Sequence, residues 1–208
     1  MSRPDIERAV EGQRRLYTES LAEHGIASKA VGWKDEASQR LRFDKLVEVV
    51  VGNAGFAAGD WGCGYGAMFD YLDERFGPTL TRYEGYDISE EMVSAAHDRI
   101  VDPRARFVLG SNLGPADYAF VSGTFNVRFD VPDDAWETWI EERLRELAAA
   151  ASRGIAFNLL TSYVDWREPH LYYGDPARWF DFCMRELSRS VVLLHDYPLY
   201  EWTILVRS

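Results

Sequence analysis

Apolar residues follow two patterns along the chain, recurring every three or four positions in some segments and forming short runs in others. The first pattern predicts helices and the second predicts buried strands. The expected helices cover residues 5–23, 35–51, 66–76, 89–100, 133–151 and 176–187. The expected strands cover residues 56–61, 81–86, 105–109, 117–121, 154–160, 190–195 and 199–206.

The order of these elements predicts the fold. Strands that alternate with helices form a largely parallel sheet covered on both faces. The last two strands are joined by a few residues around Pro198, and so short a connection permits only an antiparallel pair. We therefore expect an α/β fold with a seven-stranded, Rossmann-like, doubly wound sheet and an antiparallel last strand. Residues 1–208 form one domain, with 1–53 as a helical cap or lid over a catalytic fold at 54–208.

Charge and composition limit the classes of partner. The net charge is −11 and there are three lysines, which disfavours a nucleic-acid partner. No apolar stretch approaches the roughly 18–20 residues that span a bilayer, and no apolar signal segment begins the chain. Two cysteines and four scattered histidines predict neither a disulfide framework nor a metal site. We expect a cytoplasmic protein that binds no membrane.

A glycine-rich loop follows the first expected strand. Asp60, Gly62, Gly64 and Gly66 form a D-x-G-x-G-x-G pattern, and Asp87 ends the next apolar run. Glycines let a ligand approach the backbone closely, and the N-terminus of the following helix points at whatever is bound there. The pattern predicts a site for a nucleoside cofactor at the carboxyl ends of the strands.

Two cofactor classes compete for this loop. Gly62, Gly64 and Ala67 satisfy the G-x-G-x-x-G/A fingerprint of NAD-binding folds. However, Asp60, the further glycine Gly66 and the antiparallel end of the sheet favour another class. With these features, residues 54–206 resemble the class I S-adenosylmethionine-dependent methyltransferases. Residues 60–66 are similar to the first motif of that family, and residues 86–89 to its second.

The resemblance implies S-adenosylmethionine as cofactor and S-adenosylhomocysteine as product. It implies that Asp60 and the backbone of Gly62 and Gly64 face the methionine end of the cofactor, while Asp87 accepts from both ribose hydroxyls. The family often has an acid after its third strand, where this chain has Ser111 and Asn112; either could reach the adenine amine instead. The remaining cofactor contacts that the resemblance implies are Ile88, Met92 and Ser122.

Residues 32–43, upstream of the first strand, resemble a motif of small, mostly uncharacterised bacterial methyltransferases. By that resemblance Trp33, Gln39 and Arg42 approach the cofactor carboxylate or cover the site. The alternative is a surface helix on which Arg42 is solvated and Trp33 packs in the core.

The acceptor is expected over the ends of the fourth and fifth strands and under the N-terminal cap. The insertion at residues 163–176 is rich in aromatic and hydrogen-bonding side chains, and a long loop after a buried strand often forms the wall of a site. The residues expected to bind the acceptor are Phe125, Asn126, Asn158, Tyr163, Arg167 and Tyr173.

A hydroxyl acceptor needs its proton removed during methyl transfer. His170 is the first candidate base because it lies in the loop expected to cover the acceptor, and His195, beside Asp196, is the second. Tyr172 is the third candidate catalytic residue. The alternatives are structural hydrogen bonds for the histidines, packing of an ordered loop for the tyrosines and solvation for Arg167.

These observations favour a methyltransferase acting on a small molecule, at oxygen rather than nitrogen, in bacterial secondary-metabolite or sugar metabolism. Residues 121–126 lack the Asn/Asp-Pro-Pro-aromatic run of enzymes that methylate nucleic-acid amines, and residues 122–126 lack the carboxylates of metal-dependent catechol-type enzymes. An NAD-dependent oxidoreductase and a cofactor-binding protein without transfer activity remain the alternatives. The protein is expected to be a monomer or a homodimer.

Overall fold

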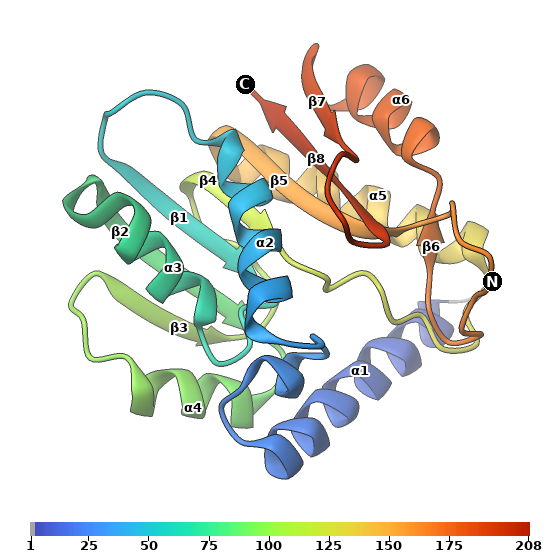
Figure 1. Cartoon of the computed structure of the whole chain (residues 1–208), viewed down its shortest axis with the longest axis horizontal. Helices are drawn as coiled ribbons and strands as arrows, with labels where there is room; N and C mark the ends of the chain where they lie inside the picture. Colours follow the sequence, from blue (N-terminus) through green and yellow to red (C-terminus); the bar gives the residue numbers. More distant parts are fainter. Residues whose placement is uncertain (1–2) are drawn as a thin grey trace.

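A twisted sheet runs through the centre of the computed structural model, which describes residues 3–208 (Figure 1). Its strands are β1 (Phe56–Trp61), β2 (Leu80–Asp87), β3 (Ala105–Leu109), β4 (Ala116–Val121), β5 (Ala151–Thr161), β6 (Tyr173–Gly174), β7 (Ser190–Leu194) and β8 (Glu201–Arg207). The strand order is β3-β2-β1-β4-β5-β8-β7, with the two-residue β6 pairing separately with β5.

The strand directions confirm the predicted fold class. Strands β1 to β5 pair in parallel, whereas β8 is antiparallel to both β5 and β7. The chain winds outward through β2 and β3 and then returns to place β4 on the other side of β1. The carboxyl ends of β1 and β4 therefore form the point at which the winding reverses, where open α/β sheets bind their ligands.

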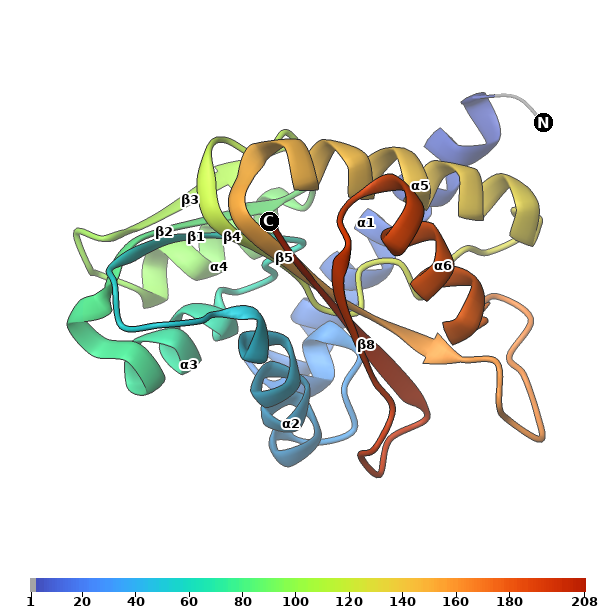
Figure 2. The ribbon, with the colours of Figure 1, turned by 90° about the horizontal axis from the view of Figure 1, so that it is seen from above.

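Helices cover both faces of the sheet (Figure 2). One face carries α2 (Glu36–Leu46), α3 (Ala67–Phe76) and α4 (Glu90–Arg99), and the other carries α5 (Asp133–Ala150) and α6 (Pro176–Glu186). Each face has its own apolar core: Phe43, Leu72 and Phe107 belong to the first, and Trp136 and Trp179 to the second. Burial on both faces explains why the central strands are continuous apolar runs.

The N-terminal helix α1 (Arg3–His24) lies apart from these layers, at the carboxyl end of the sheet (Figure 1). Gln13 is 4% exposed, and its amide donates to the carbonyl oxygens of Thr124 and Val127 at 3.3 and 2.5 Å. The Thr18 hydroxyl lies 2.9 Å from that of Ser89, at the start of α4. Polar contacts thus fasten α1 over the strand ends, while α2 packs within a helical layer.

Several boundaries differ from the sequence predictions. The helix expected at 35–51 ends at Leu46 and continues as the 3-10 turn Val47–Val49. The helix expected at 133–151 ends at Ala150, because Ala151 already pairs with Ala116 of β4. Alanine favours a helix, but pairing with a neighbouring strand decides the conformation here. The prediction also missed β6, which is too short to have a hydrophobic period.

Candidate functional site

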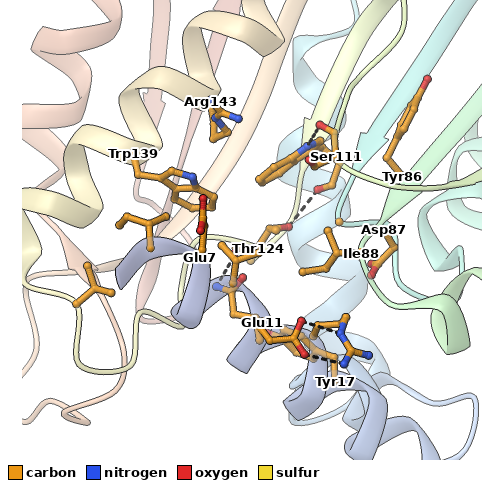
Figure 3. A pocket seen from close by; sticks show the side chains of 18 of the residues that line it. Glu7, Glu11, Tyr17, Tyr86, Asp87, Ile88, Ser111, Thr124, Trp139 and Arg143 are labelled. Carbon is orange, nitrogen blue, oxygen red and sulfur yellow. Dashed lines mark hydrogen bonds and ion pairs between the residues drawn. The ribbon is translucent and has the colours of Figure 1, made fainter. Parts of the chain in front are cut away.

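A cavity of about 1100 Å³ lies between α1 and the carboxyl ends of β1, β2 and β4 (Figure 3). In Figure 3, Trp139 and Arg143 of α5 lie on one side of the cavity, Asp87 and Ile88 lie on the other, and Glu11 projects from α1. Seven of the predicted cofactor residues line it, namely Gly62, Gly64, Asp87, Ile88, Met92, Ser111 and Ser122.

The glycine loop has the backbone that its sequence predicts. Gly62 has a φ of 83°, and a Cβ there would lie 2.3 Å from the Thr124 hydroxyl oxygen. Gly64 has a φ of 54°, and a Cβ there would lie 2.9 Å from a methyl group of Val31. L side chains rarely adopt such φ values, and no side chain fits at these contacts. The loop therefore presents bare backbone to the cavity.

Asp87 ends β2 with its carboxylate at the cavity wall. One carboxylate oxygen accepts from the backbone N–H of Gly64 and the other from that of Ser89, each at 2.9 Å. Burial raises the pKa of Asp87, and these N–H donors oppose the shift. Each oxygen of a carboxylate can accept a second hydrogen bond. Asp87 can thus bind two ligand hydroxyls while it holds the glycine loop.

Asp60 lies beneath the loop and outside the cavity lining. It is 2% exposed, and the Tyr83 hydroxyl donates to one of its carboxylate oxygens at 2.6 Å. Burial raises the pKa of Asp60 to about 7, against the effect of the Tyr83 hydrogen bond and with a contribution from Asp87. The Asp60 carboxyl group therefore changes its ionisation state near neutral pH.

This raised pKa predicts a pH-dependent stability. Between an unfolded-state pKa of about 3.9 and a folded-state pKa of about 7, the folded protein holds a proton that the unfolded chain releases. The stability contribution of Asp60 is full below the lower pKa and is lost as pH rises through the higher one. Asp60→Asn keeps an acceptor for Tyr83 without this loss. The free energy of unfolding of Asp60→Asn relative to wild type should therefore rise from about pH 5 to about pH 8.

Urea unfolding at both pH values measures this difference, and Asp98→Asn on the exposed side of α4 is the matched control. A difference between Asp60→Asn and wild type that stays constant with pH would show that Asp60 ionises normally.

Apolar and hydroxyl side chains complete the side of the cavity that contains the glycine loop and Asp87. Ile88 and Met92 supply an apolar wall, and Ser111 follows β3. Asn112 lines a smaller adjoining cavity of about 200 Å³, which shares Ser111 with the main one. The Ser122 hydroxyl oxygen is buried and has no hydrogen-bond partner among the described residues. A buried, unpaired hydroxyl at a cavity wall is available to a ligand.

Trp33 and Arg42 belong to a buried network beside the cavity. The Arg42 guanidinium donates to both carboxylate oxygens of Glu201 at 2.8 Å and lies 3.8 Å from the centre of the Trp33 ring. Asn158 donates to Glu201 at 2.8 Å and accepts from the backbone N–H of Gly123 at 2.7 Å. Arg42 is thus buried rather than solvated, and its partner is a carboxylate of this chain. The network fixes the turn after β4.

The residues expected to bind the acceptor lie outside the cavity lining. Phe125 and Asn158 are fully buried, and Asn126 accepts from the backbone N–H of Leu160 at 3.2 Å. Tyr172 is 1% exposed; its hydroxyl donates to Glu137 at 2.7 Å and accepts from the Trp179 indole at 2.9 Å. The Tyr172 pKa rises well above its usual value, chiefly through burial and then through Glu137. These side chains hold the core and loop together.

No residue of the loop at 163–176 is among the residues that line the cavity. Tyr163 is 69% exposed, and its ring packs 5.9 Å from the ring of His195, which is also exposed. His170 is exposed, and its backbone carbonyl accepts from the backbone N–H groups of residues 128 and 129. Arg167 lies 5.5 Å from the ring of Tyr173 and donates to the loop backbone. The structure therefore brings neither candidate histidine to the cavity.

Sequence reasoning missed the residues that α1 and α5 contribute. Val10 and Tyr17 of α1 and Thr138, Trp139 and Arg143 of α5 line the cavity instead of the loop. Both helices were predicted, but the spacing of apolar residues that predicts a helix does not show which of its turns lines a site. The spacing of Trp136 and Trp139, three residues apart, was the one signal of a shared aromatic face.

The described residues form neither a metal-binding cluster nor a membrane-spanning helix. Within residues 3–208, no group of three or more His, Cys, Asp or Glu side chains is placed to hold a metal ion. None of the described helices is long and apolar enough to span a membrane.

Solved structures with low sequence identity share this fold. Magnesium protoporphyrin IX methyltransferase from Synechocystis, with bound S-adenosylhomocysteine, aligns over 98% of both chains with 15% identity and a TM-score of 0.64. A methyltransferase from Leishmania major aligns over 98% of this chain and 83% of its own with 13% identity and a TM-score of 0.68. Human N-acetylserotonin methyltransferase, with S-adenosylmethionine, covers 96% of this chain and 66% of its own at 15% identity and a TM-score of 0.58.

A sequence relative identifies the family. No family model matches the chain. The Mycobacterium tuberculosis protein named "Putative methyltransferase Rv1506c" is 49% identical over 156 residues, which are 73% of this chain and 93% of that protein. This identity decides against the NAD-dependent alternative, and the cofactor is S-adenosylmethionine. The chain belongs to the class I S-adenosylmethionine-dependent methyltransferases.

Proposed function

We propose that the chain methylates a small molecule at an oxygen atom. The observation that carries the proposal is that one continuous cavity of about 1100 Å³ extends from the glycine loop to α5. Pockets for one ligand typically measure about 300–1,000 Å³, so this cavity has room for the cofactor and an acceptor together. Two structural neighbours are named for magnesium protoporphyrin IX and N-acetylserotonin, which are small molecules. We further propose that it acts in bacterial secondary-metabolite or sugar metabolism, in the cytoplasm; the methyltransferase relative comes from a bacterium.

The residues of the cavity fit the cofactor. We propose that the backbone of Gly62 and Gly64 approaches its methionine end, that Asp87 accepts from its ribose hydroxyls and that Ile88 packs against its adenine. The absence of space for a Cβ in the loop and the unpaired Ser122 hydroxyl support this assignment. The bound cofactor supplies an electrophilic methyl group on a sulfonium centre.

Methylation of a hydroxyl forms a carbon–oxygen bond, breaks the carbon–sulfur bond and releases the hydroxyl proton. The task of the chain is to align the acceptor, exclude water and provide a place for that proton. The described lining contains no histidine, but it contains the carboxylates of Glu7, Glu11, Asp134 and Glu142. We propose that a carboxylate, rather than His170 or His195, receives the proton.

Methyl transfer from labelled cofactor tests the function. The protein is incubated with S-adenosylmethionine carrying a labelled methyl group and with a bacterial metabolite extract, and the products are separated by size. The label should appear in small molecules as methyl ethers or esters. Label in nucleic acid, or cofactor binding without transfer to any fraction, would contradict the proposal.

A further inference from the structure

The part of the cavity between α1 and α5 contains a rigid aromatic surface. Trp139 is half-buried and lines the cavity. Its ring stacks on Trp136 at 4.5 Å and 28°, and meets the edge of Phe125 at 5.8 Å and 86°. Trp136 is fully buried, and its indole donates to the Phe125 carbonyl at 2.9 Å. The core therefore holds the Trp139 ring in place while part of it remains open to the cavity.

Apolar side chains extend this surface on both helices. Ile6 and Val10 line the cavity from α1, Val131 lines it just before α5, and Ala135 lines it from the first turn of α5. Together with Trp139 they form a wall suited to a flat apolar face, which we call the α1–α5 compartment. Aromatic rings of this kind bind planar groups by stacking.

Carboxylates surround the α1–α5 compartment. Glu7 and Glu11 lie on α1, and Asp134 and Glu142 lie on α5. Ionised carboxylates only accept hydrogen bonds, so a ligand among them must supply the donors. Hydroxyl and ammonium groups meet this requirement, whereas a ligand carboxylate or phosphate does not.

The two arginines of the lining are already paired. Arg14 donates to both carboxylate oxygens of Glu11, at 2.9 and 2.7 Å. Arg143 pairs with Glu146 at 2.6 Å and with Glu142 at 4.0 Å, while its buried Nε has no hydrogen-bond partner among the described residues. An anionic ligand would compete with these glutamates for the two guanidinium groups and would meet the surrounding negative charge. The charges of the α1–α5 compartment thus oppose anions.

We infer that the α1–α5 compartment binds the methyl acceptor, and that the acceptor is a neutral or cationic molecule with hydroxyl or ammonium donors around a flat apolar face. This inference rests on the proposed function, because it assigns the cofactor to the side of Asp87 and the glycine loop. The turn after β4, which begins at Ser122, lies between β1 and β5 and connects the two sides.

Three matched phenols test the inference: tyrosol is neutral, tyramine is cationic and 4-hydroxyphenylacetate is anionic. Each is titrated by calorimetry into wild-type protein saturated with S-adenosylhomocysteine. Tyrosol and tyramine should bind at least about tenfold more tightly than 4-hydroxyphenylacetate. Trp139→Ala should weaken the binding of tyrosol and tyramine at least about fivefold. Trp166→Ala, in the loop at 163–176 and 68% exposed, is the control and should leave it unchanged.

Binding of S-adenosylhomocysteine itself separates the possible failures. The affinity for S-adenosylhomocysteine should change less than about twofold in Trp139→Ala and in Trp166→Ala. If Trp139→Ala weakens the binding of S-adenosylhomocysteine as much as it weakens the binding of tyrosol and tyramine, the α1–α5 compartment belongs to the cofactor and the inference is wrong. Equal or stronger binding of the anion, or no binding of tyrosol and tyramine, also overturns it. A wild-type protein that does not bind S-adenosylhomocysteine contradicts the proposed function itself.

Discussion

Replacing Asp87 with asparagine is expected to weaken S-adenosylhomocysteine binding by at least about tenfold and up to about a hundredfold. The carboxylate accepts from Gly64 and Ser89 at 2.9 Å each and retains a second acceptor site on each oxygen. An asparagine amide nitrogen can only donate, so one backbone N–H and one ribose hydroxyl lose their acceptor. Hydrogen bonds to charged groups are worth about 1.5–3 kcal/mol, which gives this range.

Calorimetric titration of the folded variant measures the loss. Asp98→Asn makes the same change of charge at an exposed position of α4, and it should bind like wild type. Retained affinity in Asp87→Asn would mean that the ribose hydroxyls are bound elsewhere, although the cavity itself could still be the cofactor site.

Replacing Glu201 with alanine is expected to lower the free energy of unfolding by about 3–5 kcal/mol. The Glu201 side chain is 1% exposed and that of Arg42 is 9% exposed, so the variant leaves a buried guanidinium without its partner. Asn158 loses its acceptor as well. Burial raises the pKa of Glu201, and the interactions with Arg42 and Asn158 oppose that shift.

Urea unfolding gives the change in stability, provided that the slope with denaturant stays constant. The double variant Arg42→Met/Glu201→Leu removes both charges and replaces them with apolar groups of similar size. It should be markedly more stable than Glu201→Ala, because an unpaired buried charge costs more than an absent pair. A loss below about 1 kcal/mol in Glu201→Ala would show that water reaches Arg42.

The fold and the conformation of the glycine loop were predictable because their signals are local. Apolar runs predict the buried strands, and the positions of Gly62 and Gly64 require a backbone that other residues rarely adopt. Asp87 follows β2 directly, so its place at the strand ends follows from the topology. Local sequence was sufficient to predict the parts of the cavity wall that the backbone itself forms.

The side of the cavity between α1 and α5 was not predictable because its contacts join distant parts of the chain. Tyr172 was a candidate catalytic residue, but its hydroxyl is paired with Glu137, 35 residues away. The loop containing His170 was expected to cover the site, whereas α1 covers it, fastened by Gln13 to the turn after β4. The spacing of apolar residues predicts helices and strands, but it does not predict which of two polar segments covers a cavity.

Calorimetry of the wild-type protein with S-adenosylhomocysteine and with NADH tests the central claim most directly, since both ligands carry an adenosine. We predict that S-adenosylhomocysteine binds with a dissociation constant of micromolar order or below, about −8 kcal/mol, and that NADH gives no detectable heat. Binding of NADH without binding of S-adenosylhomocysteine, by protein shown to be folded, would contradict the account.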